Sequence, residues 1–124
     1  MEKKKILLVD DELDVLLMLE KRFAAEGYSV ITADNGERAI SLAKFQKPDL
    51  IVLDVQMPDM DGGEVAFKLK EDSTTKDIPV VFSTCLLSVA ESNHIRHESG
   101  GNIMLAKAKD TKELIAVVND ILSS

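Results

Sequence analysis

Five short apolar runs recur along the chain, and none of them alternates apolar with polar residues. They occupy residues 6–9, 28–33, 50–53, 79–83 and 103–105. Runs of this kind are typical of strands that are buried on both faces of a sheet. A helical segment follows each run, and strands that alternate with helices usually form a parallel sheet. Because crossovers between parallel strands are right-handed, helices cover both faces of the sheet. The sequence therefore predicts an α/β fold with a doubly wound five-stranded parallel sheet in a three-layer sandwich.

The first two helical segments carry recognisable end signals. Residues 14–26 place apolar side chains at helical spacing, and Gly27 follows as the expected C′ residue. Asp34 and Glu37 have the spacing of a capping box, so we expect the second helix to begin at Asp34. Pro48 should end that helix, since proline cannot continue it.

Three further helices are expected, over residues 65–70, 88–99 and 114–122. The segment 88–99 has thin apolar cover, because Val89, Ala90 and Ile95 are its only apolar residues. Helices are held mostly by burial of an apolar face. We therefore expect a helix over Ser88–Ser99 that is the least firmly packed of the five.

The composition narrows the classes of function. The 124 residues suffice for one domain, and no apolar run approaches the roughly 20 residues that span a membrane. The formal net charge of −7 repels phosphate backbones and disfavours direct binding to nucleic acid. A single cysteine, Cys85, excludes an internal disulfide and fits a reducing cytosol.

Acidic residues end two of the apolar runs. Asp54 closes the third run, while Asp10, Asp11 and Glu12 follow the first. Ligands of open α/β sheets bind at the carboxyl ends of the strands, so these carboxylates should share one crevice. Their mutual repulsion needs a cation or a proton to relieve it. Any one of them alone could be a helix cap or a solvated strand end, but together they predict a divalent metal site with Asp54 as nucleophile.

The order and spacing of these groups resemble the receiver domains of two-component response regulators, the CheY-like family, over essentially the whole chain. The segments that carry the resemblance are 9–12, 49–62 and 79–84, followed by Lys107. The resemblance implies a flavodoxin-like (βα)5 fold and a single receiver domain over residues 1–124. It also implies a cytoplasmic signalling protein whose Asp54 accepts a phosphoryl group from a sensor histidine kinase or phosphotransfer protein. The downstream target is unknown, and a homodimer is possible for a domain of this family.

By the same resemblance, Mg²⁺ or Mn²⁺ is the cofactor. Asp11 should bind the ion directly, Asp10 should act mainly through metal-bound water, and the backbone carbonyl of Gln56 should supply another oxygen. Asp54 completes this set of ligands. Mg²⁺ keeps several waters, so a few protein oxygens suffice. The competing interpretation of Asp10 and Asp11 is that they cap the following helix.

The resemblance assigns two more residues to the phosphoryl group. Thr84 should hydrogen-bond it and reorient on activation, whereas strand alternation should turn the adjacent Ser83 away from the site. Lys107 should pair with Asp54 and later with a phosphoryl oxygen. Lys109 competes for that role, but Lys107 lies nearer the strand end and in the family's register.

The chain departs from the family pattern at several positions. Ala108 stands where a proline preceded by a cis bond is usual, so we expect either a trans bond with a reshaped loop or a strained cis bond. Met104 replaces the aromatic residue that changes rotamer together with the hydroxyl residue. In receiver domains, two further positions tune hydrolysis of the acyl phosphate, and here they are Gln56 and Leu86. An apolar Leu86 cannot orient an attacking water, which predicts a long-lived phosphorylated state.

Other functions remain open at this point. A degenerate receiver that works only as a protein-interaction module is suggested by Met104, by Ala108 and by the weak helix expected over residues 88–99. A second alternative is an aspartyl-phosphate hydrolase, but such enzymes usually have a second aspartate where Gln56 stands. A third is a flavin-binding protein, which needs a Ser/Thr/Gly-rich phosphate loop, whereas Asp10-Asp11-Glu12 would repel the phosphate. A receiver would catalyse its own phosphorylation and dephosphorylation without a separate substrate. Met1 favours a native start, but a stand-alone and an excised domain both fit.

Overall fold

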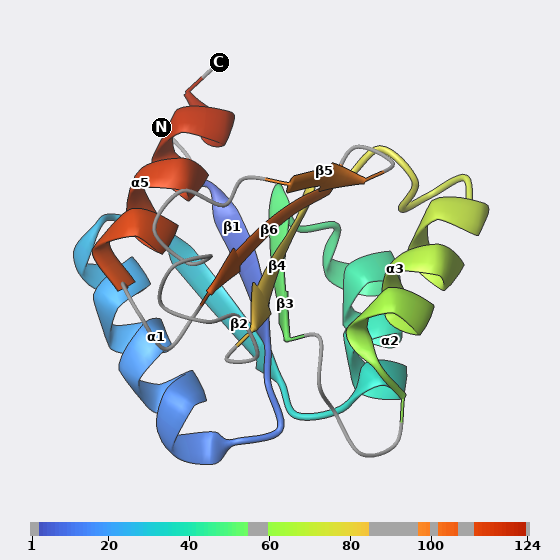
Figure 1. Ribbon diagram of the computed structural model, residues 1–124, viewed down its shortest axis with the longest axis horizontal. Helices are drawn as coiled ribbons and strands as arrows, with labels where there is room; N and C mark the ends of the chain where they lie inside the picture. Colours follow the sequence, from blue (N-terminus) through green and yellow to red (C-terminus); the bar gives the residue numbers. More distant parts are fainter. Residues whose placement is uncertain (1–2, 55–59, 85–96, 100–101, 107–110, 124) are drawn as a thin grey trace.

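The computed structural model describes residues 3–54, 60–84, 97–99, 102–106 and 111–123 (Figure 1). Within these ranges the chain forms the following elements: β1 (Lys5–Val9), α1 (Leu13–Ala25), β2 (Ser29–Ala33), α2 (Gly36–Gln46), β3 (Leu50–Asp54), α3 (Gly62–Glu71), β4 (Val80–Thr84), β5 (His97–Ser99), β6 (Asn102–Ala106) and α5 (Thr111–Leu122). No helix among the described residues is long and apolar enough to cross a bilayer.

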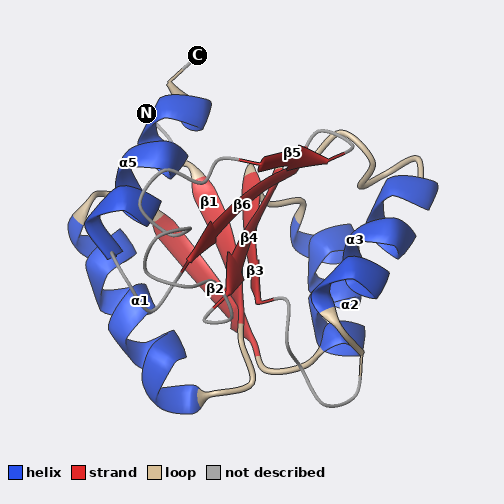
Figure 2. Cartoon of the chain, viewed as in Figure 1, coloured by secondary structure: helices blue, strands red, loops and turns tan. Residues whose placement is uncertain are grey.

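The strands form one sheet in the order β2-β1-β3-β4-β6-β5. β2, β1, β3, β4 and β6 are mutually parallel, and they correspond to the five predicted strands. Figure 2 shows α1 and α5 on one face of the sheet and α2 and α3 on the other. The predicted fold, a doubly wound parallel sheet in a three-layer sandwich, is therefore confirmed.

Two apolar cores lie on the two faces of the sheet, and strand alternation divides the buried side chains between them. The core under α1 and α5 takes Ile6, Leu8, Leu50, Val52 and Val81 from the strands. The core under α2 and α3 takes the alternate positions: Leu7, Val9, Ile51, Leu53, Val80 and Phe82. Because almost all of these side chains are fully buried, each strand residue has a defined face, including the polar residues at the strand ends.

The ends of α1 and α2 differ in how well they were predicted. Gly27 follows α1 with a φ of 97°, the left-handed conformation expected of a C′ glycine. The predicted start of α2 at Asp34 is wrong, because Asn35 is the N-cap and its Oδ1 accepts a hydrogen bond from the backbone N–H of Arg38 at 2.8 Å. Asp34 instead accepts a hydrogen bond from the Asn35 side-chain amide at 2.9 Å. The cap therefore lies one residue later than the capping-box spacing indicated.

The predicted helix over Ser88–Ser99 is wrong for its last three residues. His97–Ser99 form β5, which pairs antiparallel with β6 in the register His97↔Met104 and Ser99↔Asn102. β6 would otherwise present a row of open backbone groups along this edge of the sheet, and β5 pairs with them. The rest of that predicted helix lies outside the described residues.

Candidate functional site

Asp10 and Asp54 lie side by side at the carboxyl ends of two neighbouring strands. The register between β1 and β3 ends with the pair Val9↔Leu53, so Asp10 and Asp54 occupy the next positions. The backbone N–H of Asp10 also donates to the carbonyl of Ala33 at 3.2 Å, which continues the pairing with β2. Both carboxylates are only 2% exposed. Two acidic side chains are therefore held next to each other at a nearly buried edge of the sheet.

The loop after β1 adds two more carboxylates to this edge. Asp10 Oδ1 accepts a hydrogen bond from the backbone N–H of Glu12 at 2.9 Å, which turns the chain just before α1 begins. Carboxylate oxygens of Asp10, Asp11 and Glu12 consequently lie within 4.8 Å of one another. Asp10 is buried, whereas Asp11 and Glu12 are exposed. The structure thus brings together the three acidic residues of the loop after β1, and Asp54 lies on the neighbouring strand without being part of this cluster.

This donor set fits a hard divalent cation. All the side-chain donors are carboxylate oxygens, the ligands that Mg²⁺ and Ca²⁺ prefer. Because Asp11 and Glu12 are exposed, water can reach the cluster from their side. Ionised carboxylates at this separation repel one another, and a bound cation removes that repulsion. The cluster is therefore suited to hold a hard divalent cation, and the buried carboxylate of Asp54 lies on the neighbouring strand.

The structure places two of the remaining predicted site residues, Thr84 and Met104. Thr84 ends β4 and pairs with Ala106, the last residue of β6, so Thr84 lies at the same sheet edge as Asp54. Met104 pairs with Phe82 within the sheet. The other predicted site residues lie outside the described residues, and their roles stay predictions: Gln56, Leu86, Lys107 and Ala108, together with the competing Lys109.

Ser83 lies beside Asp54, contrary to the sequence analysis. Asp54 and Ser83 are register partners in the β3–β4 pair, and partners in parallel strands present their side chains to the same face. Ser83 is 3% exposed, and its Oγ has no hydrogen-bond partner among the described residues. The expectation that alternation turns Ser83 away from the site is therefore wrong. Alternation along β4 alone could not reveal this, because the register against β3 decides the face.

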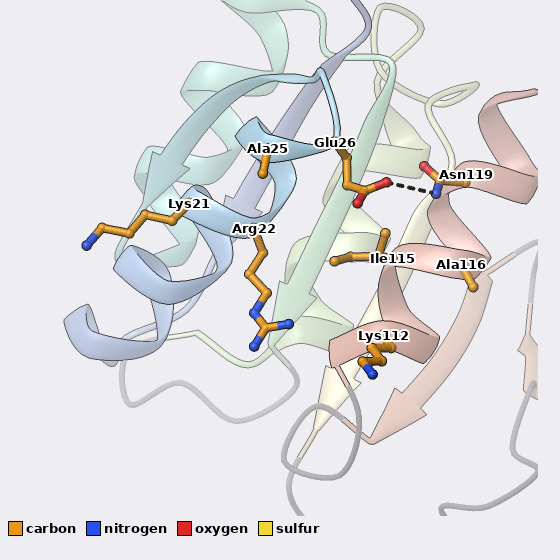
Figure 3. A pocket seen from close by; sticks show the side chains of 8 residues that line it. All are labelled: Lys21, Arg22, Ala25, Glu26, Lys112, Ile115, Ala116 and Asn119. Carbon is orange, nitrogen blue, oxygen red and sulfur yellow. Dashed lines mark hydrogen bonds between the residues drawn. The ribbon is translucent and has the colours of Figure 1, made fainter.

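A hollow of about 620 Å³ lies apart from the carboxylates, between α1 and α5 (Figure 3). Its α1 side comes from residues 21–26, well after the helix start at Leu13. The side-chain amide of Asn119 donates to Glu26 across the hollow at 3.5 Å, and the Tyr28 hydroxyl donates to Asn119. Burial, with a smaller contribution from Glu26, raises the pKa of Tyr28 above its ordinary value. These bonds tie the C-terminal end of α1 to α5.

Comparison with known proteins identifies close resemblances over nearly the whole chain. The family model described as response regulator receiver domain matches residues 6–119. The chain is 40% identical over 120 residues to "Probable transcriptional regulator ycf27" of Cyanophora paradoxa, which covers 97% of this chain and 48% of that protein. It is 42% identical over 118 residues to "Response regulator PleD" of Caulobacter vibrioides, covering 94% of this chain and 26% of that protein. The chain thus spans about half the length of the first relative and about a quarter of the second.

A solved structure supports the same relationship. The chemotaxis protein CheY4 of Vibrio cholerae superposes with a TM-score of 0.82 at 27% sequence identity. The alignment covers 96% of this chain and 98% of that one.

Proposed function

Because the chain belongs to the response regulator receiver domain family of two-component systems, we propose that it accepts a phosphoryl group on Asp54. The observation that carries the proposal is the position of Asp54, which is buried on the strand next to Asp10 at the sheet edge that also carries the carboxylate cluster of Asp10, Asp11 and Glu12. A carboxylate nucleophile next to a metal site is the arrangement that formation of an acyl phosphate needs.

The chemistry is a single displacement at phosphorus. A carboxylate oxygen of Asp54 forms the new O–P bond while the P–N bond of a phosphohistidine donor breaks, and the departing imidazole takes the electron pair. Fixed strand geometry aids this step, because the nucleophile is held in place before the donor arrives. The chain promotes its own modification and turns over no separate substrate.

We assign the cation, Mg²⁺ or Mn²⁺, to Asp11 and Asp54, with Asp10 acting through metal-bound water and the Gln56 backbone carbonyl as a further ligand. When bound, the ion offsets negative charge on the transferring phosphoryl group. Asp10 supports this site through its hydrogen bond to the Glu12 N–H, which orients the loop that carries Asp11. The exposure of Asp11 leaves room for the waters that Mg²⁺ retains.

Thr84 and Lys107 complete the proposed phosphoryl site. Thr84 ends β4 at the same sheet edge as Asp54, and its role as a hydroxyl donor rests on the family resemblance, because alternation gives the face of Asp54 to Ser83. Lys107 directly follows Ala106, the register partner of Thr84. A lysine ammonium there would neutralise phosphoryl charge as a mobile point charge. Leu86 is proposed to slow hydrolysis, while Met104 and Ala108 would alter how the modification reaches the output surface.

Exposed apolar side chains on the first half of α1 form the proposed docking surface for the protein that donates the phosphoryl group. Leu13, Leu17 and Met18 are 64%, 56% and 41% exposed, and they lie on the half of α1 that begins two residues after Asp11. Exposed apolar side chains beside a reactive site are suited to bind a partner protein. We propose a sensor histidine kinase or a phosphotransfer protein as that partner.

The output is proposed to run through protein contacts, to an unnamed target or to a second copy of the chain. The net charge of −7 disfavours direct contact with nucleic acid by this segment. The single cysteine fits a reducing, cytoplasmic setting.

Intact mass after incubation with acetyl phosphate and Mg²⁺ tests the proposed function. We expect a gain of one phosphoryl group, lost in Asp54→Asn and in metal-free controls. A folded protein that gains nothing would overturn the proposal in favour of a receiver fold that works only as an interaction module.

A further inference from the structure

Ser83 carries a buried hydroxyl that has no role in the site described so far. It is 3% exposed, and its Oγ has no hydrogen-bond partner among the described residues. Buried hydroxyls are usually paired, and an unpaired one lowers the stability of the state in which it is unpaired. Such a group is expected to find a partner in another state of the protein.

The register of β4 places one carboxylate next to Ser83. Its register partner on β3 is Asp54, and its register partner on β6 is Leu105. Val81, two residues earlier on the same face of β4, belongs to the apolar core under α1 and α5. Neighbouring strands lie about 4.8 Å apart, so the short side chains of Ser83 and Asp54 can meet after a rotation about χ1.

Asp54 has capacity for this additional bond. A carboxylate offers about four lone-pair positions on two oxygens, so its existing interactions leave room for another donor. Asp54 also lies between Asp10 on β1 and Ser83 on β4, because β3 is the strand between them. One carboxylate oxygen can therefore face the acidic cluster while the other accepts from Ser83.

We propose that Ser83 is a positioning residue for Asp54, an inference that rests on the proposed function. Its hydroxyl, which has no hydrogen-bond partner among the described residues, donates to Asp54 when the carboxylate turns to attack the phosphoryl donor. This hydrogen bond would hold the carboxylate in the orientation in which it attacks, and a reacting group fixed in a near-attack geometry reacts faster. Ser83 would thus raise the rate of phosphorylation without raising the affinity for the donor.

The test is the rate of phosphorylation of Ser83→Ala at several acetyl phosphate concentrations with Mg²⁺, followed by intact mass. We expect the limiting rate to fall about tenfold, as for one lost hydrogen bond to a charged group, and the half-saturating concentration to stay unchanged. The unfolding free energy should not fall, because the variant removes a buried hydroxyl that has no partner in the described part of the chain. Ser83→Thr, which keeps the hydroxyl, should restore most of the rate, and Ser83→Cys, similar in size, replaces Ser83→Ala if the latter does not fold.

Thr75→Val is the matched control. Thr75 is also fully buried, but its hydroxyl donates to the carbonyl of Leu69 at 2.6 Å, and it belongs to the loop after α3. This variant should lose stability and keep the wild-type rate. A rate loss that tracks stability in both variants would overturn the inference.

The remaining outcomes separate the inference from the proposed function. If the wild type is phosphorylated on Asp54 and Ser83→Ala matches its rate, the positioning role is wrong and the proposed function stands. If the wild type gains no phosphoryl group, both are wrong.

Discussion

Asp10 accepts a hydrogen bond from the backbone N–H of Glu12 at 2.9 Å. This bond makes the loop after β1 turn back on itself and brings the oxygens of Asp10, Asp11 and Glu12 within 4.8 Å of one another. Sequence neighbours alternate direction in an extended chain, so three consecutive carboxylates converge only because the loop turns here. The proposed cation site therefore depends on the buried side chain of Asp10, which accepts from the backbone N–H of Glu12 two residues later.

Asp11→Asn should weaken Mg²⁺ binding by about tenfold or more, since it removes a charged ligand from a site of hard oxygen donors. Isothermal titration calorimetry with magnesium chloride measures the change. Asp14→Asn is the matched control, because Asp14 is acidic and exposed but lies outside the cluster, in the first turn of α1. Equal losses in the two variants would mean that general surface charge, not a ligand, governs the affinity.

Asn35→Ala should lower the unfolding free energy by about 1 kcal/mol, the usual effect of removing an N-cap side chain. Its Oδ1 satisfies the backbone N–H of Arg38, which otherwise has no intrahelical partner. Asp34→Ala should cost clearly less in the same urea titration, because Asp34 precedes the cap. A larger loss of unfolding free energy in Asp34→Ala than in Asn35→Ala would instead support Asp34 as the N-cap, as the capping-box spacing predicted.

Gly36→Ala should destabilise the fold by about 1–3 kcal/mol, even though alanine favours a helix over glycine. A Cβ at this position would lie 2.8 Å from Cγ2 of Val65 and 3.0 Å from Cβ and Sδ of Met60. The glycine is thus needed where α2 passes close to α3. In urea unfolding, the double variant with Val65→Ala should lose less than the sum of the two single variants, and strict additivity would argue against this contact.

Asp72 should titrate with a pKa of about 2, below its ordinary value of 3.8. Hydrogen bonds from the Thr74 side chain and backbone are the main causes, and Lys44, whose Nζ lies 3.2 Å from Oδ2, contributes less. Because the folded-state pKa is lowered, the stabilisation is fully present above about pH 3.8 and is lost as the pH falls through 2. Carboxyl-carbon NMR should place the pKa of Asp72 higher in Thr74→Val than in Lys44→Met. The opposite order would show that the ion pair dominates.

The sequence predicted most of this architecture because its signals are local. Five apolar runs without alternation indicated five parallel strands, and Gly27 marked the end of α1 through a conformation that glycine favours. Acidic residues at two strand ends indicated the site, since all parallel strands point their carboxyl ends to one edge.

The mistaken predictions concern relationships between segments. Residues 97–99 form a strand by pairing with the edge of β6. The local sequence of these three residues does not contain that pairing. The position of Ser83 depends on its register against Asp54, and no pattern within β4 contains that register. Asn35 rather than Asp34 caps α2 because the backbone there is extended until Asn35, a one-residue difference that the capping-box spacing did not reveal.

The most direct test of the central claim is to locate the modified residue. Wild-type protein treated with acetyl phosphate and Mg²⁺ is reduced with borohydride, which converts an aspartyl phosphate to a stable alcohol, and the change is then mapped by peptide mass spectrometry. We predict reduction at residue 54 alone, abolished in Asp54→Asn. Reduction at Asp10 or Asp11, or no reduced residue in a folded protein that binds Mg²⁺, would contradict the assignment of Asp54 as the phosphoryl acceptor.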